Sequence, residues 1–181
     1  LLEGGWLPTG DMGRLDDDGF LYITGRIKDL IITAGGENVP PTLIEACIQR
    51  ELPVLSHCVV VGDRRKYLAA LLATPLERAA AGPGDQEGGE EPPPRTLPAA
   101  SCAQLGLPAG TAVDDPAFRE RVQQGIDAAN QQATSSAQTI KRWALLPAEL
   151  SLERQEITPT LKVRRQAVCE RHASVIESLY T

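Results

Sequence analysis

Residues 58–73 read CVVVGDRRKYLAALLA, two apolar runs around a short polar segment, and they are the best guide to the fold class. The β-branched run 58–61 is typical of a strand and ends at a Gly-Asp pair. Residues 68–73 are continuously apolar, which fits either a buried strand or a buried helix. Because the polar segment between the two runs is short, we interpret 68–73 as a second strand.

Similar signals occur upstream of this pair. Residues 12–15 and 20–24 flank an Asp-Gly dipeptide, which is typical of tight β-hairpin turns. A further apolar run at 30–33 stops at a Gly-Gly pair. Beyond it, two prolines precede apolar residues at helical spacing, so we expect a short helix that ends near Arg50.

The composition changes between Pro75 and Asp115. The middle of this segment is rich in glycine, proline and acidic residues and poor in apolar side chains. Such a segment buries too little surface to offset the entropy that is lost on ordering. We therefore predict a disordered insertion at about 75–115.

Order resumes at Pro116. Apolar residues recur every three or four positions from 118 to 137, which is the period of one helix face, and two aspartates before Pro116 offer an N-cap. Residues 143–146 favour a strand and 163–179 a final helix, in which we interpret His172 as a packed residue at the edge of the core. These segments predict an α+β fold: a leading β-hairpin, then a small, roughly three-stranded sheet with packed helices.

Composition excludes several classes of function. The 181 residues carry a net charge of -6, which gives no general attraction for nucleic acid. No run approaches the roughly 20 apolar residues that a membrane span needs. The cysteines are too far apart for a CxxC motif and the two histidines lack metal-ligand spacing, so we expect reduced thiols, no metal site and no histidine-based hydrolase. The cysteines are Cys47, Cys58, Cys102 and Cys169.

Three segments carry side chains suited to chemistry: WLPTGD at 6–11, GRIKD at 25–29 with GGEN at 35–38, and TPTLKVRR at 158–165. A carboxylate in a tight turn suits a ribose diol, and an arginine after a hairpin suits a sugar hydroxyl or a phosphate. A lysine near a helix start can stabilise developing negative charge. Each side chain also fits a structural role: Asp11 as a turn former, Arg26 in a surface ion pair, and Lys162 as a solvated lysine.

Together and in this order, the segments resemble the C-terminal region of the acyl-adenylate-forming superfamily. That superfamily includes acyl-CoA synthetases, firefly luciferase and the adenylation domains of peptide synthetases. The resemblance covers roughly residues 6–74 and 118–180. The phrases IITAGGENVPP at 31–41 and QGIDAANQ at 124–131 are most similar to the long-chain acyl-CoA synthetases, in particular to the bubblegum branch.

The resemblance implies roles for two groups of residues. Asp11 matches the aspartate that holds the ribose hydroxyls of ATP or AMP, and Arg26 matches an arginine that also contacts the nucleotide. Lys162 matches the lysine that bridges carboxylate and phosphate oxygens while the acyl-adenylate forms.

A second set of residues is implied to act in domain movement and thioester formation. Lys28 matches the hinge about which the small domain turns between two half-reactions. Many members have aspartate at the hinge and glycine before the catalytic lysine. Here Lys28 and Leu161 stand at those positions, which we attribute to the long-chain branch. The loop that lines the pantetheine tunnel is matched by Gly35, Gly36 and Glu37.

The reaction implied by the resemblance has two steps. A fatty acid is activated with ATP to acyl-AMP, and CoA then takes the acyl group; magnesium is expected on the polyphosphate. Residues 1–24 are implied to be the end of a large domain and the hairpin that leads to the hinge, and residues 25–181 the C-terminal lid. The large domain is expected to complete the sites for fatty acid, ATP and CoA, so that the fragment alone is inactive.

The resemblance also suggests a cellular location, and two alternative functions stand beside the main one. We expect a cytoplasmic protein, with any peripheral membrane contact made through the large domain, and no nucleic-acid partner. One alternative is another acyl-adenylating ligase with a different acceptor. A second is a non-catalytic interaction module in which the insertion is the functional part.

Overall fold

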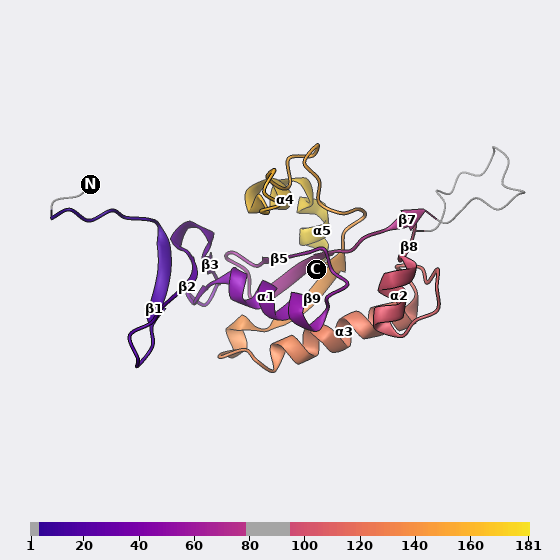
Figure 1. The fold of residues 1–181 in the computed structure, drawn as a ribbon, viewed down its shortest axis with the longest axis horizontal. Coiled ribbons are helices and arrows are strands. Elements are labelled where there is room, and N and C mark those ends of the chain that lie inside the picture. The colour runs from indigo at the N-terminus through magenta and orange to yellow at the C-terminus, as the bar shows by residue number, and fades with distance from the viewer. Residues whose placement is uncertain (1–3, 79–94) are drawn as a thin grey trace, which may run out of the picture.

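A β-hairpin begins the chain and projects from one end of the molecule (Figure 1). The structure is a computed structural model that describes residues 4–78 and 95–181. Strand β1 (Asp11–Leu15) pairs antiparallel with β2 (Leu21–Arg26), and Gly19 in the turn has a φ of 86°. The Asp16 carboxylate accepts the Phe20 N–H at 2.8 Å and closes the turn. The hairpin predicted from the Asp-Gly pair is confirmed.

Four short elements connect the hairpin to the main body. Two of their apolar residues, Ile31 and Val39, are buried and pair across a small antiparallel ladder. Proline is tolerated in the first helical turn because its missing N–H would have no intrahelical partner there. The elements are η1 (Ile27–Asp29), β3 (Ile31–Ile32), β4 (Asn38–Val39) and α1 (Pro41–Glu51).

The central sheet has three strands in the order β5-β6-β9. β5 (His57–Val61) lies antiparallel to β6 (Leu68–Ala73), and β6 lies parallel to β9 (Ile140–Leu145). All six residues of β6 are buried, as expected for a middle strand that is covered on both faces. The interpretation of 68–73 as a strand is therefore confirmed, and β9 starts three residues before the expected run.

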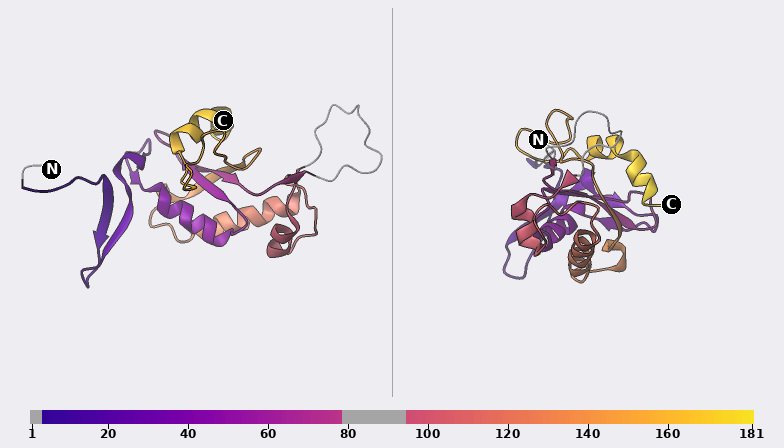
Figure 2. Two further views of the ribbon diagram at one scale, coloured as in Figure 1. Left: turned by 45° about the horizontal axis from the view of Figure 1, so that its top comes forward. Right: turned by 90° about the vertical axis from the view of Figure 1, so that its right-hand side faces the viewer.

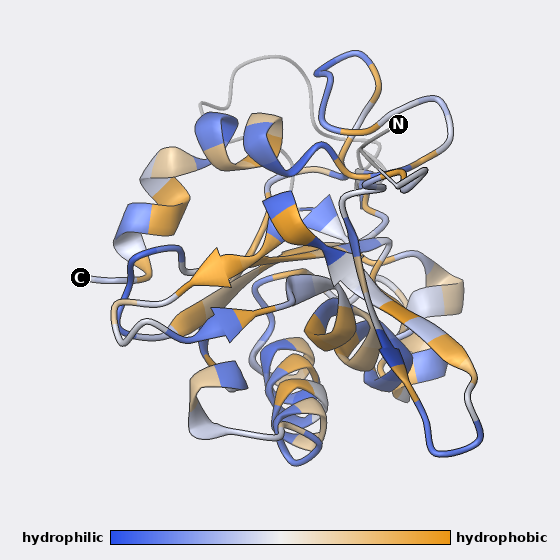
Figure 3. Ribbon diagram, turned by 90° about the vertical axis from the view of Figure 1, so that its left-hand side faces the viewer, coloured by the Kyte–Doolittle hydropathy of each residue, from blue (hydrophilic) through white to orange (hydrophobic). Residues whose placement is uncertain are grey.

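Helices cover both faces of this sheet (Figure 2). Because side chains alternate along a strand, β5 sends Val60 into the core beneath α1 and α3 (Pro116–Asn130), and Val59 into a second core beneath α4 (Arg165–Arg171) and α5 (Ala173–Ser178). Figure 3 shows hydrophobic strands in the middle of the molecule and mixed colours along the surrounding helices.

The expected disordered insertion is wrong in its extent. Within 75–115, residues 79–94 lie outside the described part of the chain, but 95–115 are ordered. Their buried side chains, Leu97, Cys102 and Val113, pack into the core beneath α1 and α3 and so offset the ordering entropy. The elements here are β7 (Glu77–Arg78), β8 (Arg95–Thr96) and α2 (Ala99–Leu105).

Side-chain hydrogen bonds define both ends of helix α3. Asp115 accepts the Ala117 N–H at 2.8 Å, which confirms the expected N-cap. The helix ends at Asn130, earlier than the apolar period to 137 predicted. The reason is that the Asn130 amide bonds both the N–H and the C=O of Ile140, at 2.8 and 2.9 Å, and turns the chain toward β9 through η2 (Ser136–Gln138).

The final helix is also shorter than expected, because it breaks into α4 and α5 at His172. His172 has a φ of -102° and a ψ of 23°, outside the helical region, and its ring contacts a buried carboxylate described below. Among the described residues, no helix is both long enough and apolar enough to cross a membrane.

Candidate functional site

Asp11 and Arg26 face each other at the base of the hairpin. They are register partners in the β1–β2 ladder, and Arg26 Nε lies 3.4 Å from Asp11 Oδ1. The Asp11 N–H bonds Thr9 Oγ1 at 3.2 Å, which keeps the turn before β1 tight. The side chains are 34% and 54% exposed, so this ion pair is weak in water and both groups are open to a ligand. A carboxylate beside a guanidinium can hold neighbouring hydroxyl groups of a sugar.

Lys28 lies in the short 3-10 helix η1, between the hairpin and the main body. The Ile27 N–H donates to Gly10 C=O at 2.9 Å, and the Leu30 N–H donates to Ile27 C=O at 3.3 Å. The Lys28 side chain is exposed. An exposed residue in a short segment between two structural units is typical of a hinge, which absorbs a change of backbone angles.

Residues Gly35, Gly36 and Glu37 form the turn between β3 and β4. The Gly36 N–H donates to Thr33 C=O at 2.9 Å, and the Glu37 N–H donates to Thr33 Oγ1 at 3.2 Å. Gly36 has a φ of 79° with no atom near its missing side chain, so its glycine serves backbone conformation. The Ala34 N–H bonds the Arg65 C=O at 2.9 Å, which ties this turn to the β5–β6 turn.

Lys162 lies near the tip of a loop built like a small hairpin. The Thr158 N–H donates to Lys162 C=O at 2.8 Å, and the Lys162 N–H donates to Thr158 Oγ1 at 3.1 Å. Leu161, at the tip, has a φ of 60°. This left-handed conformation disfavours side chains with a Cβ, which explains physically why glycine suits this position in the family pattern. The Lys162 side chain is exposed, three residues before α4 begins.

The structure therefore places the predicted nucleotide, pantetheine and catalytic residues in three separate places: the base of the β1–β2 hairpin, the β3–β4 turn and the Lys162 loop. The described residues contain no hydrogen bond or ion pair that joins the Asp11–Arg26 pair, the Gly35–Glu37 turn and the Lys162 loop to one another. A threonine hydroxyl accepts a main-chain N–H in each of the three places, and the side chains of Asp11, Glu37 and Lys162 are exposed.

Sequence reasoning missed a buried carboxylate, Glu156, beside the Lys162 loop. Its side chain is 1% exposed, with Nε2 of His172 at 3.0 Å and Nε of Arg154 at 2.8 Å. Burial alone would raise the pKa of Glu156, but hydrogen bonds from the Ser151 N–H, His172 and Arg154 outweigh it and lower the pKa below its ordinary value. The sequence pattern gave no signal for it, because a glutamate among charged residues is usually exposed.

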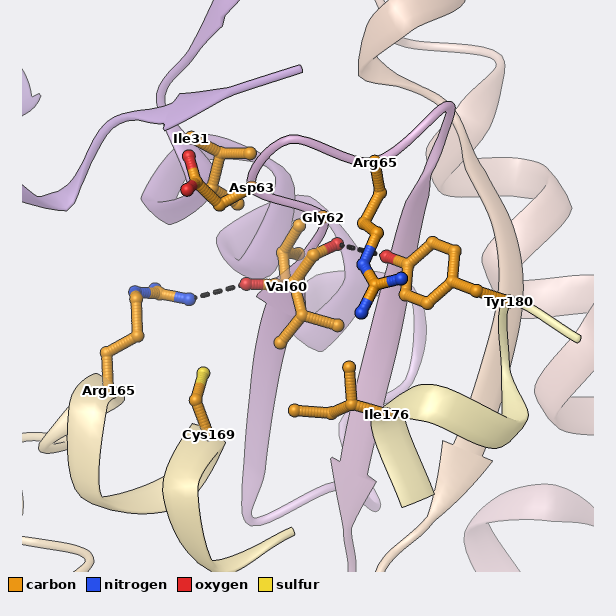
Figure 4. Close-up of a pocket in the computed structure, with 10 residues that line it drawn as sticks. Ile31, Val60, Gly62, Asp63, Arg65, Arg165, Cys169, Ile176 and Tyr180 are labelled. Atoms are coloured by element: carbon orange, nitrogen blue, oxygen red, sulfur yellow. Dashed lines mark hydrogen bonds between the residues drawn. The ribbon is translucent and has the colours of Figure 1, made fainter. Parts of the chain in front are cut away.

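A cavity of about 210 Å³ lies between β5 and the helices α4 and α5 (Figure 4). Cys169 and Ile176 point from the helices toward β5, and Tyr180 closes one end, where its hydroxyl donates to Val61 C=O at 3.2 Å. Burial raises the pKa of Cys169, so its thiol is neutral and a poor nucleophile at neutral pH. None of the residues matched to the family's site lines this cavity.

No metal centre is formed within residues 4–78 and 95–181. This part of the chain has no group of three or more histidine, cysteine or carboxylate side chains that could hold an ion. The four cysteines are free thiols, and Cys58 and Cys102 are buried.

Comparison with known proteins decides the family. The model described as the AMP-binding enzyme C-terminal domain matches residues 28–88 and 105–181. The chain belongs to this family. The match includes Lys28, the Gly35–Glu37 turn and the Lys162 loop, whereas Asp11 and Arg26 lie before it.

Individual relatives of this AMP-binding C-terminal domain are long-chain-fatty-acid–CoA ligases. The ligase ACSBG2 of Rattus norvegicus is 40% identical over 185 residues, which cover 99% of this chain and 27% of the relative. The ligase ACSBG1 of Mus musculus is 42% identical, over 97% of this chain and 24% of the relative. The chain thus spans about a quarter of the length of the curated relatives it matches.

Solved structures confirm the α+β fold of this AMP-binding C-terminal domain. The adenylation domain of a carboxylate reductase from Mycobacterium chelonae gives a TM-score of 0.66 at 19% identity, over 95% of this chain and 22% of that one. A two-domain piece of the Segniliparus rugosus carboxylic acid reductase, solved with AMP, gives a TM-score of 0.62 at 20% identity, over 96% and 20%. The leading hairpin and the three-stranded sheet with packed helices are confirmed.

Proposed function

We propose that this chain is the C-terminal lid of an ATP-dependent long-chain fatty acid–CoA ligase. The observation that carries the proposal is the identity of about 40% to such ligases, which extends over 99% of the chain and so includes every candidate loop. The larger part of the enzyme, with the acyl pocket, lies outside this chain. We place the activity in the cytoplasm.

The first half-reaction uses the nucleotide-facing side chains. A fatty carboxylate oxygen attacks the α-phosphorus of ATP, forms the acyl-AMP bond and releases pyrophosphate. We assign Asp11 and Arg26 to the ribose, because their carboxylate and guanidinium lie side by side and exposed. We assign Lys162 to the carboxylate and phosphate oxygens, where its ammonium stabilises the charge that builds up in the transition state. Magnesium is expected on the polyphosphate, but residues 4–78 and 95–181 contain no cluster that could hold it, and we assign no residue to it.

The second half-reaction uses another face of the lid. The sulfur of CoA attacks the acyl carbonyl, and AMP leaves while the thiol proton is lost. We assign the Gly35–Glu37 turn to the pantetheine arm, because two glycines leave the main chain open to close approach. Lys28 is the hinge between these two arrangements, with residues 1–24 moving with the large domain. Exposed apolar side chains on the hairpin support this division, since a large domain would cover them: Leu15, Phe20 and Ile23 are 68%, 66% and 63% exposed.

The direct test of the proposal is fatty-acid-dependent exchange of pyrophosphate into ATP by the full-length protein. We expect exchange with long-chain fatty acids and little with acetate or aromatic acids. Exchange that is absent with every fatty acid, in a folded protein, would overturn the proposal. Exchange that prefers aromatic acids would point to a different acyl-adenylating ligase.

The hinge assignment predicts that Lys28→Pro separates the two half-reactions. Proline fixes φ near about -65°, which suits the 3-10 conformation that Lys28 adopts in η1. We expect one half-reaction to survive and the other to fall by at least about tenfold, whereas Lys28→Ala leaves both nearly unchanged. The measurements are pyrophosphate exchange and acyl-CoA formation from supplied acyl-AMP. If Lys28→Pro retained the same fraction of wild-type activity in both half-reactions, the hinge role would be wrong.

A further inference from the structure

Glu156 is a fully buried carboxylate that no proposed step uses. Its Oε2 accepts the Ser151 N–H at 3.1 Å and Arg154 Nε at 2.8 Å. Its Oε1 lies 3.0 Å from His172 Nε2 and 3.7 Å from Arg171 Nε. Burying an ionised carboxylate is strongly unfavourable unless it is fully paired, and apolar packing would fill the space without that penalty. A carboxylate at this position is explained if it holds the neighbouring segments in a fixed arrangement.

The side chain of Glu156 joins two segments that border the Lys162 loop. Ser151 and Arg154 belong to the turn before the loop, and His172 stands at the end of α4, the helix that follows it. The Glu156 carboxylate thus holds the turn before the Lys162 loop against the C-terminal end of α4, the helix that follows the loop. The result is a closed unit of turn, loop and helix.

The main chain of Glu156 forms the base of the same loop. The Arg164 N–H donates to Glu156 C=O at 2.8 Å, and Ile157 and Val163 form the next bridge. The Thr158–Lys162 bond follows, and the strained Leu161 lies at the tip. Three successive cross-loop pairs therefore lead from the buried carboxylate to Lys162. A left-handed leucine is held only where the surrounding structure enforces it.

We propose that Glu156 is a positioning residue for acyl-adenylate formation, acting through the main chain of the Lys162 loop. The proposal rests on the proposed function, and it adds that this loop is rigid because a buried carboxylate anchors its base. Glu156 makes no contact with substrate in this arrangement. Without its charge, the Ser151 N–H, Arg154 and His172 no longer share an anionic acceptor, and the loop base loosens.

Half-reaction assays of Glu156→Gln in the full-length protein test the proposal. Because misplacing a reacting group by about 1 Å costs on the order of 10²-fold, we expect adenylate formation to fall by about 10- to 100-fold. Thioester formation from supplied acyl-AMP should stay within about threefold, since Lys162 takes no part in it. Glu153→Gln is the matched control, because Glu153 lies in the same turn and is exposed.

A double variant separates positioning from general destabilisation. In a Lys162→Ala background, Glu156→Gln should cause no further loss of adenylation, because the group that it positions is gone. Val122→Ala, on the buried face of α3, lowers the stability remote from the loop and should reduce both half-reactions alike. Should Glu156→Gln fail to fold, Arg154→Gln removes one partner and should give a smaller loss in adenylation alone.

Two results would overturn the inference. Equal losses in both half-reactions, in Glu156→Gln or in Arg154→Gln, would show that the cluster is structural. A further loss in the Lys162→Ala background would show that Glu156 acts by another route. A wild-type protein with neither half-reaction would instead refute the proposed function, which the wild-type control reports separately.

Discussion

Replacing Lys162 with alanine in the full-length protein should slow acyl-adenylate formation by about 10²-fold or more. A preorganised charge aimed at the transition state contributes on the order of 10² to 10³ in rate when it cannot be replaced by water. Lys162 is suited to this because the main chain on both sides of it is bonded to Thr158 while its side chain extends freely. Conversion of supplied acyl-AMP to acyl-CoA should change far less.

The comparison requires both half-reactions to be measured on the same preparation. Pyrophosphate exchange reports adenylation, and acyl-CoA formed from supplied acyl-AMP reports the second step. Lys141→Ala, which removes an exposed lysine on β9, is the matched control and should leave both steps unchanged. Equal losses in both steps would mean that Lys162 serves the structure of the loop and not the chemistry.

Arg165→Ala should be the most destabilising replacement of an arginine in this domain. Arg165 donates to the Val60 C=O at 2.6 Å (Figure 4). Arg165 also donates to Glu45 at 2.7 Å, and Glu45 accepts the Val60 N–H at 2.7 Å. These two side chains thus satisfy the main chain of β5 at the open edge of the sheet, where a neighbouring strand would otherwise lie. They are only 23% and 13% exposed.

Removing one partner of a largely buried pair leaves the other charge unpaired, at a cost of about 3 kcal/mol. For a domain of this size, we expect Tm to fall by roughly 6 to 12 °C. Thermal unfolding followed by circular dichroism measures this. Arg164→Ala is the control, because Arg164 is adjacent and exposed, and its replacement should shift Tm by no more than about 2 °C. Similar shifts in Tm for the two variants would contradict the role given to Arg165 at the edge of β5.

The sequence predicted the elements whose signals are local. The Asp-Gly hairpin, the β-branched strand before Gly62 and the Asp115 cap all depend on neighbouring residues, and all three are confirmed. The ordered segment 95–115 could not be predicted, because Leu97, Cys102 and Val113 follow no helix or strand period. Their burial depends on a core built by distant residues.

The candidate site, like the fold, could be predicted from the sequence only in part. Resemblance to a family pointed to Asp11, Lys28 and Lys162, and these assignments remain predictions for experiment. The left-handed conformation of Leu161 could not be predicted from residue types, because leucine does not favour a positive φ. The burial of Glu156 could not be predicted either, because it depends on the position of α4.

The lid assignment is tested by the product balance of the full-length protein with ATP, a long-chain fatty acid and CoA. We expect AMP, pyrophosphate and acyl-CoA to form in equal amounts, and bound acyl-AMP to remain when CoA is omitted. We expect residues 1–181 alone to form none of these products, because they carry only part of the site. Formation of ADP in place of AMP, or acyl-CoA synthesis by this chain alone, would show that the chain is not the lid of such a ligase.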